Sequence, residues 1–193
     1  MRKIILSLAF ILIFTFLNFN SSFAQEELSI KEATMSSASQ EVNKSADYQL
    51  PYPGILPDNP LYFLKAIRDR IVGLLISDPL KKAEFDLLQA DKRLNTGIYL
   101  FKMGKSKQAL ALSTISKGEN YFEEAIAKVR EGKRQNLETN DILRRLSDSS
   151  YKHQEVLKSF EKTSSKDFKE KIVSLQKRAE DFESQVESLR SQQ

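Results

Sequence analysis
The spacing of apolar residues constrains this chain more than any other feature, because it alternates between four and three positions along much of residues 79–190. The last stretch is unbroken and runs Phe168, Ile172, Leu175, Ala179, Phe182, Val186, Leu189. This spacing places the apolar side chains on one face of an α-helix. The 193 residues include only six glycines and five prolines, too few for the turns of a β-sandwich or a loop-rich enzyme. We therefore expect an all-α fold.

Five helices are expected from the points at which the apolar spacing starts and stops. A short helix over about 60–76 has five large apolar residues on one face: Leu61, Leu64, Ile67, Ile71, Leu74. Four longer helices follow over about 79–103, 106–131, 140–163 and 165–190. Because their connections are short, consecutive helices should be antiparallel, as an up-and-down bundle or an array of helical hairpins.

Particular residue types mark the ends of these helices. Asp78, which precedes a proline, has the pattern of an N-cap. Gly104 and Gly132 should end the second and third helices, since glycine readily adopts the left-handed conformation found there. The pair Ser164-Ser165 should cap the last helix.

The helices over 79–103 and 106–131 alternate large and small residues. The first has Leu80, Ala83, Leu87, Ala90, Leu94, Gly97, Phe101 on one face. The second has Ala111, Ile115, Gly118, Phe122, Ala125, Val129. Small residues let two backbones approach closely while the large side chains interdigitate. These two helices should therefore form a tight antiparallel pair.

The first 50 residues differ from the rest. Residues 1–24 resemble a secretory signal, with Arg2 and Lys3, an apolar run over 4–19, and a small residue at Ala24. The run is short for a bilayer span of about 20 residues, so we expect cleavage after Ala24 and a secreted or extracytoplasmic protein. An uncleaved N-terminal anchor is the alternative. Residues 25–50, rich in Ser, Glu, Lys, Ala and Gln, should form a disordered linker.

The distribution of charge argues against nucleic acid as a partner. Residues 1–24 hold two basic and no acidic residues, so without them the net charge falls from +4 to +2. Basic residues otherwise cluster at two helix ends: Lys102, Lys105, Lys107, Lys128, Arg130, Lys133, Arg134. Cations are stabilised at helix C-termini by the helix dipole, so solvated turns are expected there, and an anionic partner such as a wall polymer or lipid headgroup is the alternative. We expect no nucleic-acid partner, and membrane contact only through an uncleaved signal segment.

Few residues offer catalytic or metal-binding chemistry. The chain has no cysteine and one histidine, which excludes thiol catalysis and the usual zinc sites. Gly104-Lys105-Ser106 resembles the end of a phosphate-binding loop, but the glycine needed five positions earlier is Tyr99. Neighbouring carboxylates such as Glu123 and Glu124 point in different directions on a helix. No catalytic, cofactor-binding or metal-binding residue is assigned, no cofactor is expected, and the chain should not be an enzyme.

The single histidine lies in the apolar series of the 140–163 helix: Ile142, Leu146, Ser149, His153, Val156, Phe160. His153 is expected to be a neutral core residue, hydrogen-bonded to Ser149 or Ser150 one turn earlier. The alternative is a pH sensor or general base, since histidine titrates near neutrality.

A proline-rich segment precedes the first helix. Residues 51–65 hold four of the five prolines and read Pro-Tyr-Pro-Gly-Ile-Leu-Pro-Asp-Asn-Pro-Leu-Tyr-Phe-Leu-Lys, with Asn59 as a candidate N-cap. This string, with Asp78-Pro79-Leu80-Lys81-Lys82-Ala83-Glu84 and Ala90-Asp91-Lys92-Arg93-Leu94, resembles a bacterial family described as domain of unknown function 5667. The resemblance covers about 51–131 and leaves 132–193 as an additional helical hairpin of the domain 51–193. It implies helical, extracytoplasmic bacterial proteins without an assigned activity.

The expected function follows from these observations. An exported helical protein without catalytic residues should act by binding or scaffolding at the cell envelope, with a protein or another envelope component as its partner. The alternative is an extracytoplasmic helical chaperone or stress sensor, which would expose an apolar concave face.

Overall fold
The computed structural model describes residues 48–192, so the expected signal segment and most of the expected linker lie outside the described residues. The helices are α2 (Tyr62–Leu75), α3 (Pro79–Lys102), α4 (Gln108–Arg134), α5 (Asn140–Thr163) and α6 (Lys169–Ser191). One-turn 3₁₀ helices, η1 (Lys105–Lys107) and η2 (Lys166–Phe168), precede α4 and α6. The described residues contain no strand, and the expectation of an all-α fold with one short and four long helices is confirmed.

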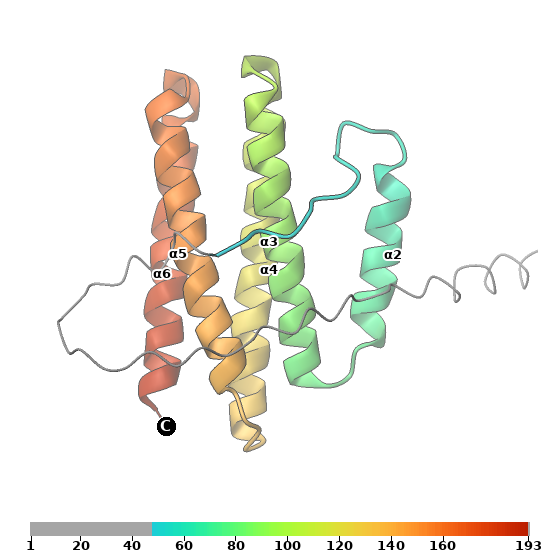
Figure 1. Cartoon of the computed structure of the whole chain (residues 1–193), viewed down its shortest axis with the longest axis vertical. Coiled ribbons are helices and arrows are strands. Elements are labelled where there is room, and N and C mark those ends of the chain that lie inside the picture. Colours follow the sequence, from blue (N-terminus) through green and yellow to red (C-terminus); the bar gives the residue numbers. More distant parts are fainter. Residues whose placement is uncertain (1–47, 193) are drawn as a thin grey trace, which may run out of the picture. The chain divides into compact units, whose positions relative to one another are not determined.

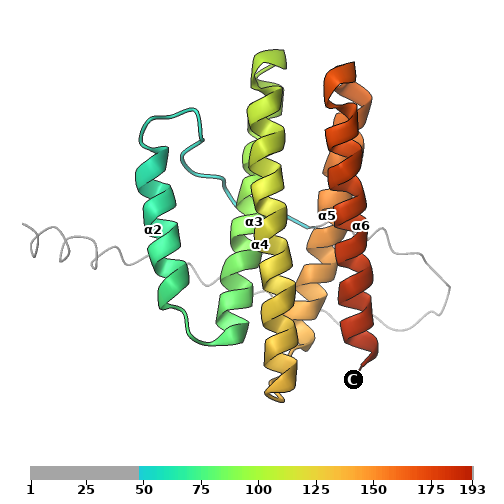
Figure 2. The same cartoon turned by 180° about the vertical axis from the view of Figure 1, so that it is seen from behind.

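The four long helices form two antiparallel hairpins, α3 with α4 and α5 with α6 (Figures 1 and 2). Contacts of α4 with α6 and of α3 with α5 join the hairpins. The short helix α2 stands at the edge of this bundle, beside α3.

All four long helices contribute to the core. One cluster joins Ala83, Leu87, Ala90, Phe122, Ala125, Ile126, Val129, Ile142, Leu143, Leu146, Phe182, Val186, Leu189. At its centre the rings of Phe122 and Phe182 stack with their centroids 4.8 Å apart. The α5–α6 hairpin therefore shares one core with α3 and α4, because its apolar series faces theirs.

The tight pairing of α3 with α4 is confirmed, and small residues allow it. A Cβ atom on Gly118 would lie 3.1 Å from the backbone oxygen of Ala90, and one on Gly97 would overlap Ile115. Ala90 itself is fully buried. The two backbones thus approach as closely as the alternation of large and small residues predicted.

Two of the predicted end signals, Gly132 and the pair Ser164-Ser165, are wrong. Helix α4 continues past Gly132 to Arg134, since Gly132 does not adopt the positive φ of a helix-ending glycine. This glycine instead makes room for Leu80, whose Cδ2 would be 2.6 Å from an added Cβ. Asn136, with φ 57°, takes the left-handed position after the helix instead. At the last helix neither serine of the 164–165 pair caps α6: η2 intervenes, and Ser165 makes no side-chain cap. The Asp78 cap is confirmed, since Asp78 Oδ1 accepts from Lys81 N at 2.8 Å.

The proline-rich segment crosses α3 before it turns into α2 (Figure 1). Asn95 Nδ2 donates to the backbone oxygen of Pro51 at 2.9 Å, and Leu50 packs against the core. The folded part therefore begins before residue 51. Asn59 Oδ1 accepts from Leu61 N at 2.9 Å, but the α-helix starts only at Tyr62, two residues later than predicted.

Candidate functional site
Helix α2 carries its large apolar side chains on the side that faces solvent. Seven of them are between 52% and 78% exposed, and we call them the outer face of α2: Leu61, Phe63, Leu64, Ile67, Ile71, Leu74, Leu75. The residues that the sequence placed on one face do share it, but the face points away from the bundle. A helix at the edge of a core normally turns such a face inward, so α2 leaves an apolar surface that the described part of the chain does not cover.

The inner side of α2 is polar, and one hydrogen bond joins it to α3. Arg93 Nη1 donates to Tyr62 Oη at 2.7 Å. Asp69 is 5% exposed and accepts from Arg68 Nη2 at 2.7 Å, with Lys65 Nζ at 3.6 Å from its other oxygen. Burial lowers the pKa of Lys65, against the opposing effect of Asp69. Because these groups occupy the inner side, the apolar side is left outward.

A groove of about 670 Å³ separates α2 from α3 and α4. Its lining mixes apolar and charged side chains: Ala66, Ile67, Asp69, Arg70, Gly73, Leu74, Lys82, Phe85, Arg93, Lys117, Asn120, Tyr121, Glu124. Within its lining, Gly73 closely approaches Phe85, whose Cε1 would lie 3.0 Å from an added Cβ. Ile67 and Leu74 of the outer face lie at the rim of this groove, and α2 contacts the bundle over a short stretch only.

The interior of the bundle holds a cluster of polar side chains around His153. Its Nδ1 lies 2.9 Å from Glu119 Oε1, and its Nε2 lies 3.4 Å from Asp91 Oδ1. Ser149 Oγ and Tyr48 Oη both donate to Asp91, each at 2.6 Å. The cluster links α3, α4, α5 and the segment before α2.

The prediction that His153 lies in the core is confirmed, since it is fully buried. The predicted neutral ring paired with Ser149 or Ser150 is wrong. Ser149 donates to Asp91, and Ser150 donates to the backbone oxygen of Ser147. Both ring nitrogens of His153 face carboxylates, which accept hydrogen bonds only, so the doubly protonated ring satisfies both contacts. Burial alone would lower the pKa of His153, but the charge of Glu119 and the hydrogen bonds that the ring donates to both carboxylates raise it to about 9.

The cluster lacks the geometry for catalysis. His153 and Ser149 are fully buried, and Asp91 is 3% exposed, so no substrate reaches them without opening the core. The Ser149 hydroxyl is bonded to a carboxylate rather than to the ring nitrogen that would activate it as a nucleophile. The cluster therefore ties helices together.

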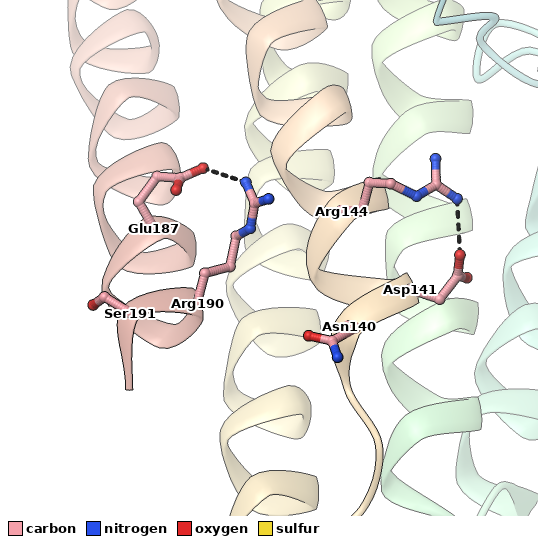
Figure 3. A pocket seen from close by; sticks show the side chains of 6 residues that line it. All are labelled: Asn140, Asp141, Arg144, Glu187, Arg190 and Ser191. Carbon is pink, nitrogen blue, oxygen red and sulfur yellow. Dashed lines mark hydrogen bonds and ion pairs between the residues drawn. The ribbon is translucent and has the colours of Figure 1, made fainter. Parts of the chain in front are cut away.

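A polar pocket lies between the start of α5 and the end of α6 (Figure 3). Its charges pair locally, Arg144 with Asp141 at 2.8 Å and Arg190 with Glu187 at 2.9 Å. Both pairs join residues three positions apart on an exposed helix surface. Such pairs contribute little, and the pocket presents no converging set of charges for a ligand.

The other sequence motifs have structural roles. Gly104, with φ 106°, follows the end of α3 and precedes η1. The prediction that it ends a helix before a polar turn is confirmed. Lys107 binds Asp58 at 3.1 Å, and Lys133 donates to the backbone oxygen of Leu189. Within residues 48–192 no group of three or more histidine or carboxylate side chains is placed to hold a metal ion. No helix of this part of the chain has the length and apolarity to cross a bilayer.

Comparison with known proteins identifies one family. A family model described as "Domain of unknown function (DUF5667)" matches residues 54–167. The match extends beyond the predicted limit at 131 and includes α5. No curated protein matches the chain. No solved structure matches it either.

Proposed function
Because this chain belongs to the DUF5667 family, whose description assigns no activity, we propose a function from its own residues. We infer that it is an exported, non-enzymatic binding module of the cell envelope. It binds its partner through the outer face of α2. The observation that carries this proposal is the outward orientation of that apolar surface.

The outer face of α2 supports binding because leaving it in water is unfavourable. Burial of each large apolar side chain contributes about 1.5–3 kcal/mol relative to full exposure. Six of the seven residues lie together on α2 and Leu61 directly precedes it, whereas exposed apolar residues elsewhere in the described chain are scattered. A contiguous apolar surface of this kind is typical of a docking site.

The N-terminal sequence supports export. The charged start, the apolar run over 4–19 and Ala24 have the order of a secretory signal. Cleavage would leave Gln25 as the first residue of the protein. The sealed cluster around His153 supports a non-enzymatic role, since its only histidine is inaccessible to a substrate.

Cell fractionation tests this proposal. The wild-type chain and the double variant Ile67→Gln/Ile71→Gln are expressed in a bacterial host, and intact mass establishes the N-terminus of each. We expect the wild type in the envelope fraction and the variant in the soluble extracytoplasmic fraction. A control variant, Tyr99→Gln/Met103→Gln, changes two exposed apolar side chains at the end of α3 and should fractionate as the wild type does. Equal fractionation of all three would contradict the proposal.

The exposed apolar surface also favours a second candidate, an extracytoplasmic chaperone or stress sensor. A chaperone would suppress the aggregation of an unfolded client protein in proportion to its own concentration. The Ile67→Gln/Ile71→Gln variant should then lose this activity. Failure of the wild type to suppress aggregation removes the candidate.

A further inference from the structure
We propose that α2 is an interfacial helix, which lies in the plane of a membrane containing anionic lipids and inserts its outer face into the acyl-chain boundary. This inference rests on the proposed function and names the partner of the same surface. It differs from the expectation that only an uncleaved signal segment would contact a membrane. The difference arises because the sequence does not show which way α2 faces.

The apolar and basic residues around α2 are arranged as in a helix that lies on a membrane surface. At 100° per residue, the six outer-face residues within the helix occupy an arc of about 120°. Arg70 borders this arc on one side and Arg68 on the other, with Val72 beyond Arg68. Arginines beside an apolar arc extend their charged ends to the headgroups while their stems stay in the apolar layer.

The sign of the exposed charge selects the kind of membrane. Arg68 and Arg70 are the exposed charged residues of α2, whereas its one acidic residue, Asp69, is turned inward and 5% exposed. Arg68 is paired with Asp69 at 2.7 Å, so Arg70 supplies the positive charge that borders the apolar surface. Anionic headgroups complement it, each nearby basic residue strengthening binding by about fivefold.

The same charges disfavour a second copy of the chain as the occupant. Two outer faces packed against each other would bring the arginines of both copies to the edges of one interface. A protein partner would need an apolar groove with carboxylates on both sides. Both alternatives remain as outcomes of the test below.

Vesicle sedimentation tests the inference directly. The full chain is purified with the N-terminus that its processing leaves, and intact mass confirms that all variants share it. It is mixed with vesicles of phosphatidylcholine alone or with phosphatidylglycerol added. We expect binding to the phosphatidylglycerol vesicles, weakened at least about tenfold in Ile67→Gln/Ile71→Gln because two half-exposed apolar side chains are lost. The Tyr99→Gln/Met103→Gln control should bind as the wild type does.

A charge variant separates electrostatic from apolar binding. Arg70→Gln should weaken binding to the phosphatidylglycerol vesicles about fivefold and leave any binding to pure phosphatidylcholine unchanged. Added salt should reduce binding of the wild type more than that of the variant. Equal effects on both vesicle types would overturn the anionic-lipid part of the inference.

The absence of cysteine from the chain allows the orientation of α2 to be measured. A polarity-sensitive dye is attached to Ile71→Cys on the outer face, or to Met103→Cys on α3. We expect a blue shift on vesicle binding for the first position and none for the second. Equal shifts at both positions would show that α2 is not the inserted element.

The combined results distinguish this inference from the proposed function. If envelope retention depends on the outer face but vesicles do not bind, the partner is a protein and the lipid inference is overturned while the proposed function stands. If analytical ultracentrifugation shows a dimer that Ile67→Gln/Ile71→Gln dissociates, and vesicles do not bind, the occupant is a second copy. If envelope retention does not depend on the outer face and vesicles do not bind, both proposals fail.

Discussion
Helices α2 and α6 have the same kind of amphipathic sequence and orient it in opposite directions. In α6 the residues of the apolar series from Ile172 to Leu189 are at most 4% exposed, whereas in α2 the outer-face residues are more than half exposed. The two helices differ in their polar residues. α6 keeps its charges on the outside, but α2 directs Asp69 and Tyr62 towards the bundle. Apolar spacing therefore defines which residues share a face, and polar partners decide where that face points.

The largest loss of stability is expected from a substitution inside the bundle, at Asp91. Asp91→Ala removes the acceptor of Tyr48, Ser149 and the His153 ring together. Because buried donors are left without a partner, we expect a loss of about 3–5 kcal/mol in the free energy of unfolding. Denaturant titration measures it, with m-values compared between variants.

The control for Asp91 is an exposed carboxylate on the same bundle. Glu155→Ala removes a partner of Lys152 from an exposed pair three residues apart and should change stability by less than about 0.5 kcal/mol. Similar losses for both variants would show that the buried cluster contributes no more than a surface ion pair.

The charge of the cluster makes the stability of the bundle depend on pH. The folded pKa of His153 is raised from 6.5 to about 9, so its stabilisation is complete below about pH 6.5 and is lost as the pH rises through 9. The free energy of unfolding should therefore fall by about 2–3 kcal/mol between pH 6.5 and 9. In His153→Gln this slope should disappear, and a slope as steep as that of the wild type would contradict the assignment.

The close approach of α3 and α4 is tested at Ala90. Ala90→Leu adds three carbons where an added Cβ on Gly118 would already be 3.1 Å from the Ala90 oxygen, so we expect a loss of about 1–3 kcal/mol by overpacking. Lys81→Leu, on an exposed position of α3, is the control and should change stability by less than about 0.5 kcal/mol. Lys92, nearer in the sequence, is half-buried and less suitable. A neutral Ala90→Leu would mean that the pair is not tightly packed.

The helices of the bundle and the pairing of α3 with α4 could be predicted because these features depend on residues that are close together in the sequence. Alternation of residues such as Ala90 and Gly118 with large apolar neighbours predicted the tight pair, and Asp78 predicted a helix start. The cluster around His153 could not be found this way, since Glu119 and Asp91 are 34 and 62 residues away from it in the chain. One signal was available: each of these acids directly follows a small residue of the α3–α4 pair, where the backbones are closest.

The smallest effect on stability is expected on the outer face of α2. Replacing an apolar residue there should leave the free energy of unfolding almost unchanged. Ile71 is 53% exposed, whereas Ile115 in α4 is fully buried. Glutamine has a helix propensity at least as good as that of isoleucine, so Ile71→Gln should change the free energy of unfolding by less than about 0.5 kcal/mol. The same exchange at Ile115 loses a buried apolar side chain and buries an amide, and it should cost about 3–5 kcal/mol. Parallel denaturant titrations of the two variants measure the contrast. A loss above about 1 kcal/mol at Ile71 would show that α2 packs its apolar face against the protein itself, and the face would then no longer be free to bind a membrane.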